Sequence, residues 1–330
     1  MERLQKNSRQ PTVLGVNIVY IGVLLLMLLA QVLLMKWIPQ TSDSSSYYWR
    51  LFILELVLIG GPPLVYMVIF KMDIGRIARF NKIKTVEVLL VLGMAIFGYG
   101  VTIIINLIWF WIASHWGVPE GQALPAIETG AQFLAAVLAI GIVPAVVEEF
   151  LFRGLILRGY EKFGSKVAII MTGILFGMLH MQLMSIPSII LLGIIISYVV
   201  YRTDSILAGI IYHFVHNTMT VGILFLQNKI QLDAGAVEGL PQDISQFSDE
   251  MLTIAFVVWG VIGFFALILF LVCLISLHKY TAGKGQVRIT SEGETRRSTF
   301  VEMLPAIIAM AIVLSSVIVE VLNMIGVIEV

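Results

Sequence analysis

The 330-residue sequence has little charge and almost no cysteine. Cys273 is its only cysteine, so the chain can form neither an intrachain disulfide nor a cysteine-ligated metal cluster. Charged residues make up 13% of the chain, about half the usual share in soluble globular proteins. A P-loop, a Rossmann glycine pattern, an HExxH helix and a nucleophilic serine elbow are all missing from the sequence, which argues against the enzyme classes that these motifs mark.

Long apolar stretches dominate the sequence, which is 59% hydrophobic and has a mean hydropathy of +0.96. A helix that crosses the hydrocarbon core needs about 20 mostly apolar residues. The stretches that meet this requirement are 13–35, 51–70, 86–112, 129–157, 166–183, 185–201, 205–226, 252–277 and 301–325. We therefore predict an all-α, polytopic transmembrane helical bundle with about nine spans. The Gly60-Gly61-Pro62-Pro63 run should kink or break the second span.

The distribution of basic residues predicts the orientation in the membrane. If the N-terminus is cytoplasmic, almost all of the 21 Lys and Arg residues lie in cytoplasmic segments. The exceptions are Lys36, Arg50 and Lys229 outside, and Arg153 within a span. The loop 227–251 is acidic and falls outside. We expect an integral protein of a bacterial plasma membrane, with a cytoplasmic N-terminus.

Charged residues inside a membrane span are costly, and their presence indicates function. The span expected at 129–157 carries Glu148, Glu149 and Arg153. Glu149 and Arg153 share a helix face four residues apart, so they should form an ion pair. Glu148 lies about 100° away from Glu149 around the helix. The residue four positions after Glu148 is Phe152, which cannot pair with a carboxylate. Glu148 must therefore find a partner on another helix or take up a proton, and such a carboxyl group can act as a general base.

Histidines in two later spans are the candidate partners of Glu148. His180 lies in the span expected at 166–183, and His213 lies four residues before Asn217 in a third span. At about 1.5 Å per residue, Glu148, His180 and His213 can meet in the inner half of the membrane if the helix at 166–183 is tilted or begins early. We assign His216, between His213 and Asn217, to a structural or supporting role.

A glutamate, two histidines and an asparagine in one membrane cavity suit hydrolysis. A carboxylate with a histidine can deprotonate a water molecule, and a second histidine with an asparagine can stabilise an oxyanion. Zinc held by Glu148, His180 and His213 is an alternative, although the short-spaced zinc signatures are missing, so we expect no cofactor. The residues alone also leave open a structural ion-pair network and a proton relay of a transporter.

At these positions the sequence resembles the CPBP family, which contains CAAX prenyl proteases and bacteriocin-processing, Abi-domain proteins. The motifs of the family are EExxxR, FxxxH, and HxxxN or HxxxD, on successive helices. In this chain they read Glu148-Glu149-x-x-x-Arg153, Phe176-x-x-x-His180 and His213-x-x-x-Asn217. Each motif alone is a weak signal, but the ordered triple within spans is a strong one. The resemblance covers about 126–226.

The resemblance implies an intramembrane endopeptidase that acts on a membrane-associated protein or peptide and binds no nucleic acid. By motif position, Glu148 and His180 would activate water, and His213 and Asn217 would form the oxyanion hole. The supporting residues would be Glu149, Arg153 and Phe176. Family members have been described as metalloproteases and as glutamic proteases, and pairing of Glu149 with Arg153 favours the glutamic mechanism because it leaves Glu148 free. Eukaryotic members cut prenylated CAAX proteins, whereas prokaryotic members are linked to bacteriocin maturation and self-immunity.

These predictions divide the chain into three parts. Residues 1–125 form N-terminal membrane helices, residues 126–226 form the protease core, and residues 227–330 form an acidic outer loop and two C-terminal helices. A non-catalytic membrane scaffold or a bacteriocin self-immunity factor is the alternative function. A proton-coupled transporter is less favoured, because the polar residues cluster without a paired broken-helix repeat.

Overall fold

The computed structural model describes residues 9–37, 44–115, 117, 125–233, 249–284 and 300–328. Within these ranges every ordered element is a helix and no strand is present, as an all-α bundle requires. The elements are α1 (Val13–Trp37), α2 (Ser44–Leu54), η1 (Glu55–Ile59), α3 (Gly61–Ile69), α4 (Ile74–Ile77), α5 (Thr85–Ala113), α6 (Gly130–Ala136), η2 (Val137–Ile142), α7 (Val143–Leu151), η3 (Phe152–Ile156), α8 (Leu157–Tyr160), η4 (Glu161–Phe163), α9 (Ser165–Leu179), α10 (Ile186–Thr203), α11 (Ile206–Asp233), α12 (Asp249–Tyr280) and α13 (Phe300–Met324). Most of the predicted acidic loop 227–251 lies outside the described residues.

Eight helical segments of the described chain are long and apolar enough to cross a membrane. They correspond to eight of the nine expected spans. The remaining one, expected at 166–183, is α9, which has 15 residues and ends at Leu179. A helix of this length measures about 22 Å, less than the roughly 30 Å of hydrocarbon core. The chain turns after the helix, where Met181 has a left-handed φ of 50°.

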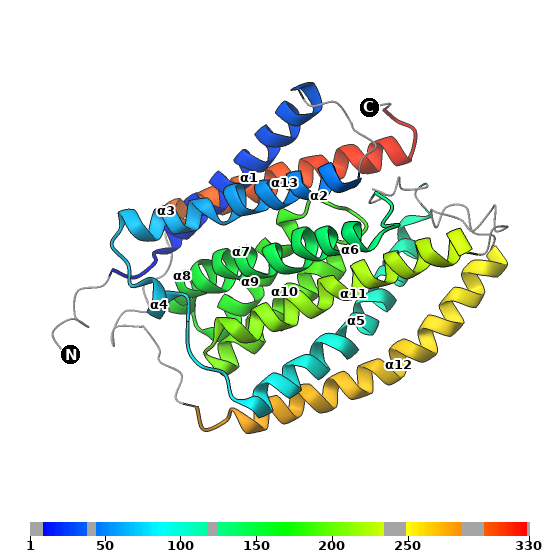
Figure 1. The fold of residues 1–330 in the computed structure, drawn as a ribbon. Helices are drawn as coiled ribbons and strands as arrows, with labels where there is room; N and C mark the ends of the chain where they lie inside the picture. Colours follow the sequence, from blue (N-terminus) through cyan, green and yellow to red (C-terminus); the bar gives the residue numbers. More distant parts are fainter. Residues whose placement is uncertain are drawn as a thin grey trace.

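The helices form a layered bundle around a central group made of α7, α9, α10 and α11 (Figure 1). On one side lie α1, α13 and the α2–α3 segment, and on the other side α5 packs against α12. In the central group α9 and α10 approach closely. A Cβ added at Gly177 would lie 2.9 Å from the backbone nitrogen of Ile190, so only glycine allows this packing.

Helices from the predicted N-terminal part pack directly on the predicted core. The buried hydroxyl of Tyr20 on α1 donates to Leu175 O on α9 at 2.9 Å. At the end of the bundle, Arg79 Nε donates to Asp204 Oδ1 at 2.9 Å, and Arg79 also pairs with Glu161. The described helices before residue 126 are therefore an integral part of the packed bundle.

The second span is interrupted where the sequence predicts a break. A π-helical turn, η1, separates α2 from α3 directly before the run that begins at Gly60. A Cβ added at Gly60 would lie 3.0 Å from Val147 Cγ1, so this glycine lets the second span come close to α7. Two further π-helical turns, η2 and η3, flank α7. Such turns are frequent at functional sites, and these three occur in the two spans that carry the buried carboxylates.

Candidate active site

Glu149 and Arg153 form the buried ion pair that their spacing predicts. Arg153 Nη1 donates to Glu149 Oε1 at 2.7 Å, and neither side chain is exposed. The guanidinium group also donates to α10, through Nη2 to Gly193 O at 2.8 Å and through Nε to Ser197 Oγ at 3.2 Å. Charge-assisted hydrogen bonds of this kind are strong and directional. Arg153 therefore neutralises Glu149 and ties α7 and η3 to α10.

The ring of Phe176 lies close to three of the polar motif residues. The guanidinium of Arg153 lies 4.6 Å from the centroid of its ring. The rings of His180 and His213 lie 5.0 Å and 5.6 Å from the same centroid. Phe176 is fully buried. The aromatic residue of the FxxxH pattern therefore acts as the packing centre of the site.

His213 is oriented by Glu149 and faces Glu148. Its Nδ1 lies 3.0 Å from Glu149 Oε1. Because the carboxylate paired with Arg153 can only accept hydrogen bonds, Nδ1 carries the hydrogen and donates it. Nε2 then points toward Glu148, with its nitrogen 3.9 Å from Glu148 Oε2. The Glu149 carboxylate at Nδ1 therefore fixes the orientation of the His213 imidazole ring.

Glu148 is buried without a local counter-charge, as its position relative to Phe152 predicts. Only 5% of the residue is exposed. Its Oε2 atom is buried and has no hydrogen-bond partner among the described residues. Leaving a buried carboxylate oxygen unpaired is energetically costly. The atom is therefore available to a water molecule or a ligand.

His180 lies at the end of α9, beside the same group of side chains. Its Nδ1 lies 2.9 Å from Phe176 O. A carbonyl oxygen only accepts, so Nδ1 carries the hydrogen and the lone pair of the neutral ring is on Nε2. Within the described residues no hydrogen bond or ion pair joins His180 to Glu148, and the histidine facing Glu148 is His213. The sequence does not distinguish these two neighbours, because they lie on different helices.

Asn217 is held by the span that carries the glutamates. Its Nδ2 donates to Ile140 O at 2.9 Å, and Ile140 belongs to the π-helical turn η2. An amide NH₂ group has two hydrogens, so one remains for a ligand. His216, between His213 and Asn217, contacts the Tyr99 ring edge-on at 5.0 Å.

A third carboxylate near the site escaped the sequence analysis. Glu55 lies in η1, on the second span, and its Oε2 atom is buried without a hydrogen-bond partner among the described residues. Its backbone oxygen accepts from Gly60 N at 3.2 Å, and Gly60 packs against Val147, the residue before Glu148. The sequence contained a usable signal, since Glu55 is an ionisable residue inside an expected span.

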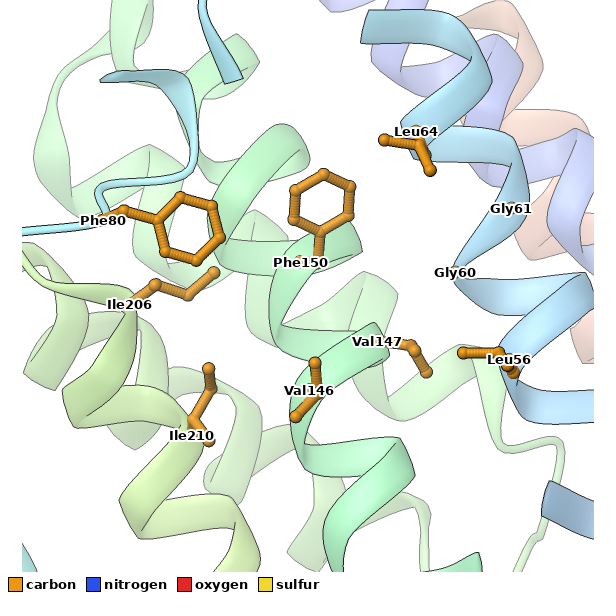
Figure 2. A pocket seen from close by; sticks show the side chains of 10 residues that line it. All are labelled: Leu56, Gly60, Gly61, Leu64, Phe80, Val146, Val147, Phe150, Ile206 and Ile210. Carbon is orange, nitrogen blue, oxygen red and sulfur yellow. The ribbon is translucent and has the colours of Figure 1, made fainter. Parts of the chain in front are cut away.

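An apolar cleft of about 370 Å³ lies beside these residues, between η1 and α3 on one side and α7 and α11 on the other (Figure 2). Its volume is within the range of small-ligand sites. The lining side chains are apolar and include Leu56, Leu64, Val146, Val147, Phe150 and Ile210. Leu56 follows Glu55 in the sequence, and Val147 precedes Glu148. The cleft therefore adjoins the segments that carry two of the buried carboxylates.

The predicted alternative of a zinc site was Glu148, His180 and His213. Among the described residues no group of three or more His, Cys, Asp or Glu side chains is arranged to hold a metal ion. Nδ1 of each histidine donates to a protein oxygen, which leaves Nε2 as the atom that could bind a metal ion, the usual arrangement of metal-ligating histidines. The donor atoms are therefore chemically suitable, but the three side chains are not grouped to hold one ion.

Taken together, the apolar helices and the buried carboxylate–histidine group define a polytopic membrane protein with a polar site inside the bundle. Residues 130–219 match the family model described as Type II CAAX prenyl endopeptidase Rce1-like. This segment runs from α6 into α11 and contains all three motifs. The matched segment is therefore a domain similar to the CAAX protease family, as the motifs indicate, and the match supports a membrane protease. No curated protein and no solved structure matches the chain.

Proposed function

We propose that this protein is an intramembrane endopeptidase that hydrolyses a peptide bond of a membrane-associated protein or peptide with water activated by Glu148. The observation that carries the proposal is that Glu148, buried beside His213, has an Oε2 atom without a hydrogen-bond partner among the described residues. Oε2 of Glu149 is also without a partner, but Glu149 Oε1 accepts from both Arg153 and His213. Glu149 is therefore held by these two residues, and Glu148 is the carboxylate left for chemistry. A positioned carboxylate that accepts the proton of water is a general base.

His180 assists Glu148 in positioning the water molecule. The hydrogen bond from Nδ1 to Phe176 O leaves the lone pair of the neutral ring on Nε2, which can accept a hydrogen bond from water. Glu148 takes a proton from this water, the oxygen attacks the carbonyl carbon, and the proton is passed to the leaving amine when the C–N bond breaks. No metal ion takes part in these steps.

His213 and Asn217 stabilise the oxyanion that forms during the attack. Asn217 offers its second amide hydrogen, because the first is held by Ile140 O. His213 donates from Nε2 when its ring is protonated, and the Glu149 carboxylate at Nδ1 stabilises that charge. Removal of one oxyanion donor reduces kcat by about 10²–10³ in known cases. We expect a loss of this size for Asn217→Ala.

The apolar cleft supports a substrate with an apolar side chain or lipid group near the cut bond. Its lining contains no charged side chain, so it suits a group that partitions into the membrane. Most Lys and Arg residues lie on the side of the membrane where the N-terminus is, which supports a cytoplasmic N-terminus in a bacterial plasma membrane. Substrates would then approach from within the bilayer.

The test compares the parent protein with Glu148→Gln, each purified and reconstituted into lipid nanodiscs, on a mass-spectrometric peptide library. The variant keeps the shape of the side chain but loses the base, so we expect turnover to fall to background. Glu320→Gln, which makes the same change on α13, is the matched control and should cleave as the parent does. Equal turnover by Glu148→Gln and the parent contradicts the proposal.

Two further measurements separate the alternatives. Metal analysis of active protein, with a chelator titration, distinguishes the glutamic mechanism from the zinc version. A parent protein that cleaves nothing but co-purifies with a membrane partner, independently of Glu148, would instead be a scaffold or self-immunity factor. Proton flux into proteoliposomes would indicate a transporter.

A further inference from the structure

A second cavity, of about 520 Å³, lies where the start of α1 passes the end of α3. It shares no lining residue with the apolar cleft beside the candidate active site. The two helices come close together at Gly15, because a Cβ added there would collide with the hydroxyl group of Tyr66. The volume is within the range of small-ligand sites. Residues of none of the three motifs line this α1–α3 pocket, so it is separate from the site described above.

The residues that line the α1–α3 pocket are of two kinds. The polar ones, Arg9, Gln10 and Thr12, all precede α1. The apolar ones include Ile18, in the second turn of α1, and Phe70, directly after α3. Because α1 is long and apolar enough to cross a membrane, the polar residues lie where this helix leaves the hydrocarbon core, at the level of the lipid head groups. Basic pockets of this kind between membrane helices bind lipid head groups.

The polar residues favour a ligand that carries both a negative charge and a hydrogen-bond donor. Of the described lining residues only Arg9 is charged, and a guanidinium group binds phosphate through two parallel hydrogen bonds. Gln10 Oε1 is buried without a hydrogen-bond partner among the described residues, and an amide oxygen only accepts. The exposed Lys71 lies between two lining residues in the sequence. Asp73, the acidic residue nearest to Lys71 in the sequence, uses its carboxylate to cap α4.

We propose that the α1–α3 pocket binds one phospholipid whose head group carries a phosphate and a hydroxyl group, such as phosphatidylglycerol. Arg9 binds the phosphate, and Gln10 Oε1 accepts a hydrogen bond from the hydroxyl group. One acyl chain lies along Ile18 and Phe70 and continues into the bilayer, because 52% of Ile18 is exposed at the surface. A free phosphate ion would satisfy Arg9 but would gain nothing from the apolar wall. The inference does not depend on the proposed protease function.

The experiment is native mass spectrometry of the full-length protein in detergent micelles, titrated with phosphatidylglycerol or phosphatidylcholine of identical acyl chains. We expect one molecule of phosphatidylglycerol to bind about tenfold more tightly than phosphatidylcholine, or better. Arg9→Gln should remove this preference, a loss of about 10-fold or more, as for a lost hydrogen bond to a charged group. Lys82→Gln removes an exposed positive charge outside the pocket and should keep the parental preference.

A second pair of lipids tests the role of Gln10. Phosphatidylethanol carries the same negative charge as phosphatidylglycerol but has no head-group hydroxyl. The parent should bind phosphatidylglycerol about 2- to 10-fold more tightly, the range for one net hydrogen bond. Gln10→Leu should bind both lipids equally. A parent that does not distinguish the two lipids would show that the hydroxyl group is not recognised and overturn that part of the inference.

Matched apolar variants separate a lipid from a free anion. Ile18→Trp fills the apolar part of the pocket, whereas Leu25→Trp changes an equally exposed position on α1 outside the pocket. Only Ile18→Trp should weaken the binding of phosphatidylglycerol, and inorganic phosphate should not displace it. If phosphate displaces the lipid and Ile18→Trp has no effect, the site binds free anions and the inference is wrong. It is also wrong if the parent binds phosphatidylcholine as tightly, or if Arg9→Gln keeps the preference.

Discussion

Replacement of Arg153 by methionine tests the central electrostatic feature of the fold. Methionine keeps the apolar stem but loses the bonds to Glu149, to Gly193 O and to Ser197 Oγ. Glu149, with no solvent exposure, would be left as an uncompensated buried charge. Breaking a buried ion pair in this way costs about 3–5 kcal/mol. We expect a loss of stability of this size, together with loss of cleavage, because His213 is oriented by the same Glu149.

The assay is unfolding in detergent micelles, followed by tryptophan fluorescence during titration with denaturant. Arg202→Met is the matched control, because Arg202 is half-buried and donates to Thr281 Oγ1 and His278 O at the end of the bundle. It should lose about 1 kcal/mol or less. The double variant Glu149→Leu with Arg153→Met removes both charges, and replacement of a whole buried pair by apolar side chains is often close to neutral.

The double variant should therefore be at least about 2 kcal/mol more stable than Arg153→Met alone. The reasoning is refuted if Arg153→Met is as stable as the parent. It is also refuted if the two substitutions destabilise additively, because additivity would show that the charges are not coupled.

The remaining predictions concern close packing and metal dependence. Gly209→Ala would place its Cβ 2.5 Å from Glu149 Oε2, so cleavage should fall at least tenfold while circular dichroism stays helical; normal activity would contradict the site geometry. Gly177→Ala would crowd the backbone of Ile190 and should cost about 1–3 kcal/mol. Gly222→Ala, with open space around the added Cβ, should leave unfolding unchanged. A zinc chelator should leave the cleavage rate unchanged, and a loss that added zinc restores would support the metal mechanism instead.

The part of the site that lies on one helix was predictable from sequence. The pairing of Glu149 with Arg153 follows from residues four apart on a helix, and the absence of such a partner for Glu148 follows from the same rule. The structure shows both. The three motifs also located the segment that matches the family model. Local geometry and residue type were sufficient for these conclusions.

Contacts between helices were less predictable. The sequence left His180 and His213 both as candidate partners of Glu148, and the structure places Nε2 of His213 3.9 Å from Glu148 Oε2. Spacing along one helix does not specify which neighbour a side chain meets on another. The length of α9 was overestimated, because hydropathy continues beyond Leu179 although the helix does not. Glu55 was not predicted, because it belongs to none of the three motifs and the approach of its span to α7 depends on the packing of two separate spans.

The three π-helical turns determine how the spans that contain them respond to the deletion of a residue. Each π turn holds one residue more than an α-helical turn, and so rotates everything after it by about 100°. The turn η2 lies before the helix that carries Glu148 and Glu149, and its Ile140 carbonyl accepts a hydrogen bond from Asn217. Deletion of one residue between Val137 and Ile142 would therefore turn Glu148 and Glu149 away from His213 without altering any motif. We therefore expect the length of this apolar stretch to determine activity as much as the polar residues that follow it.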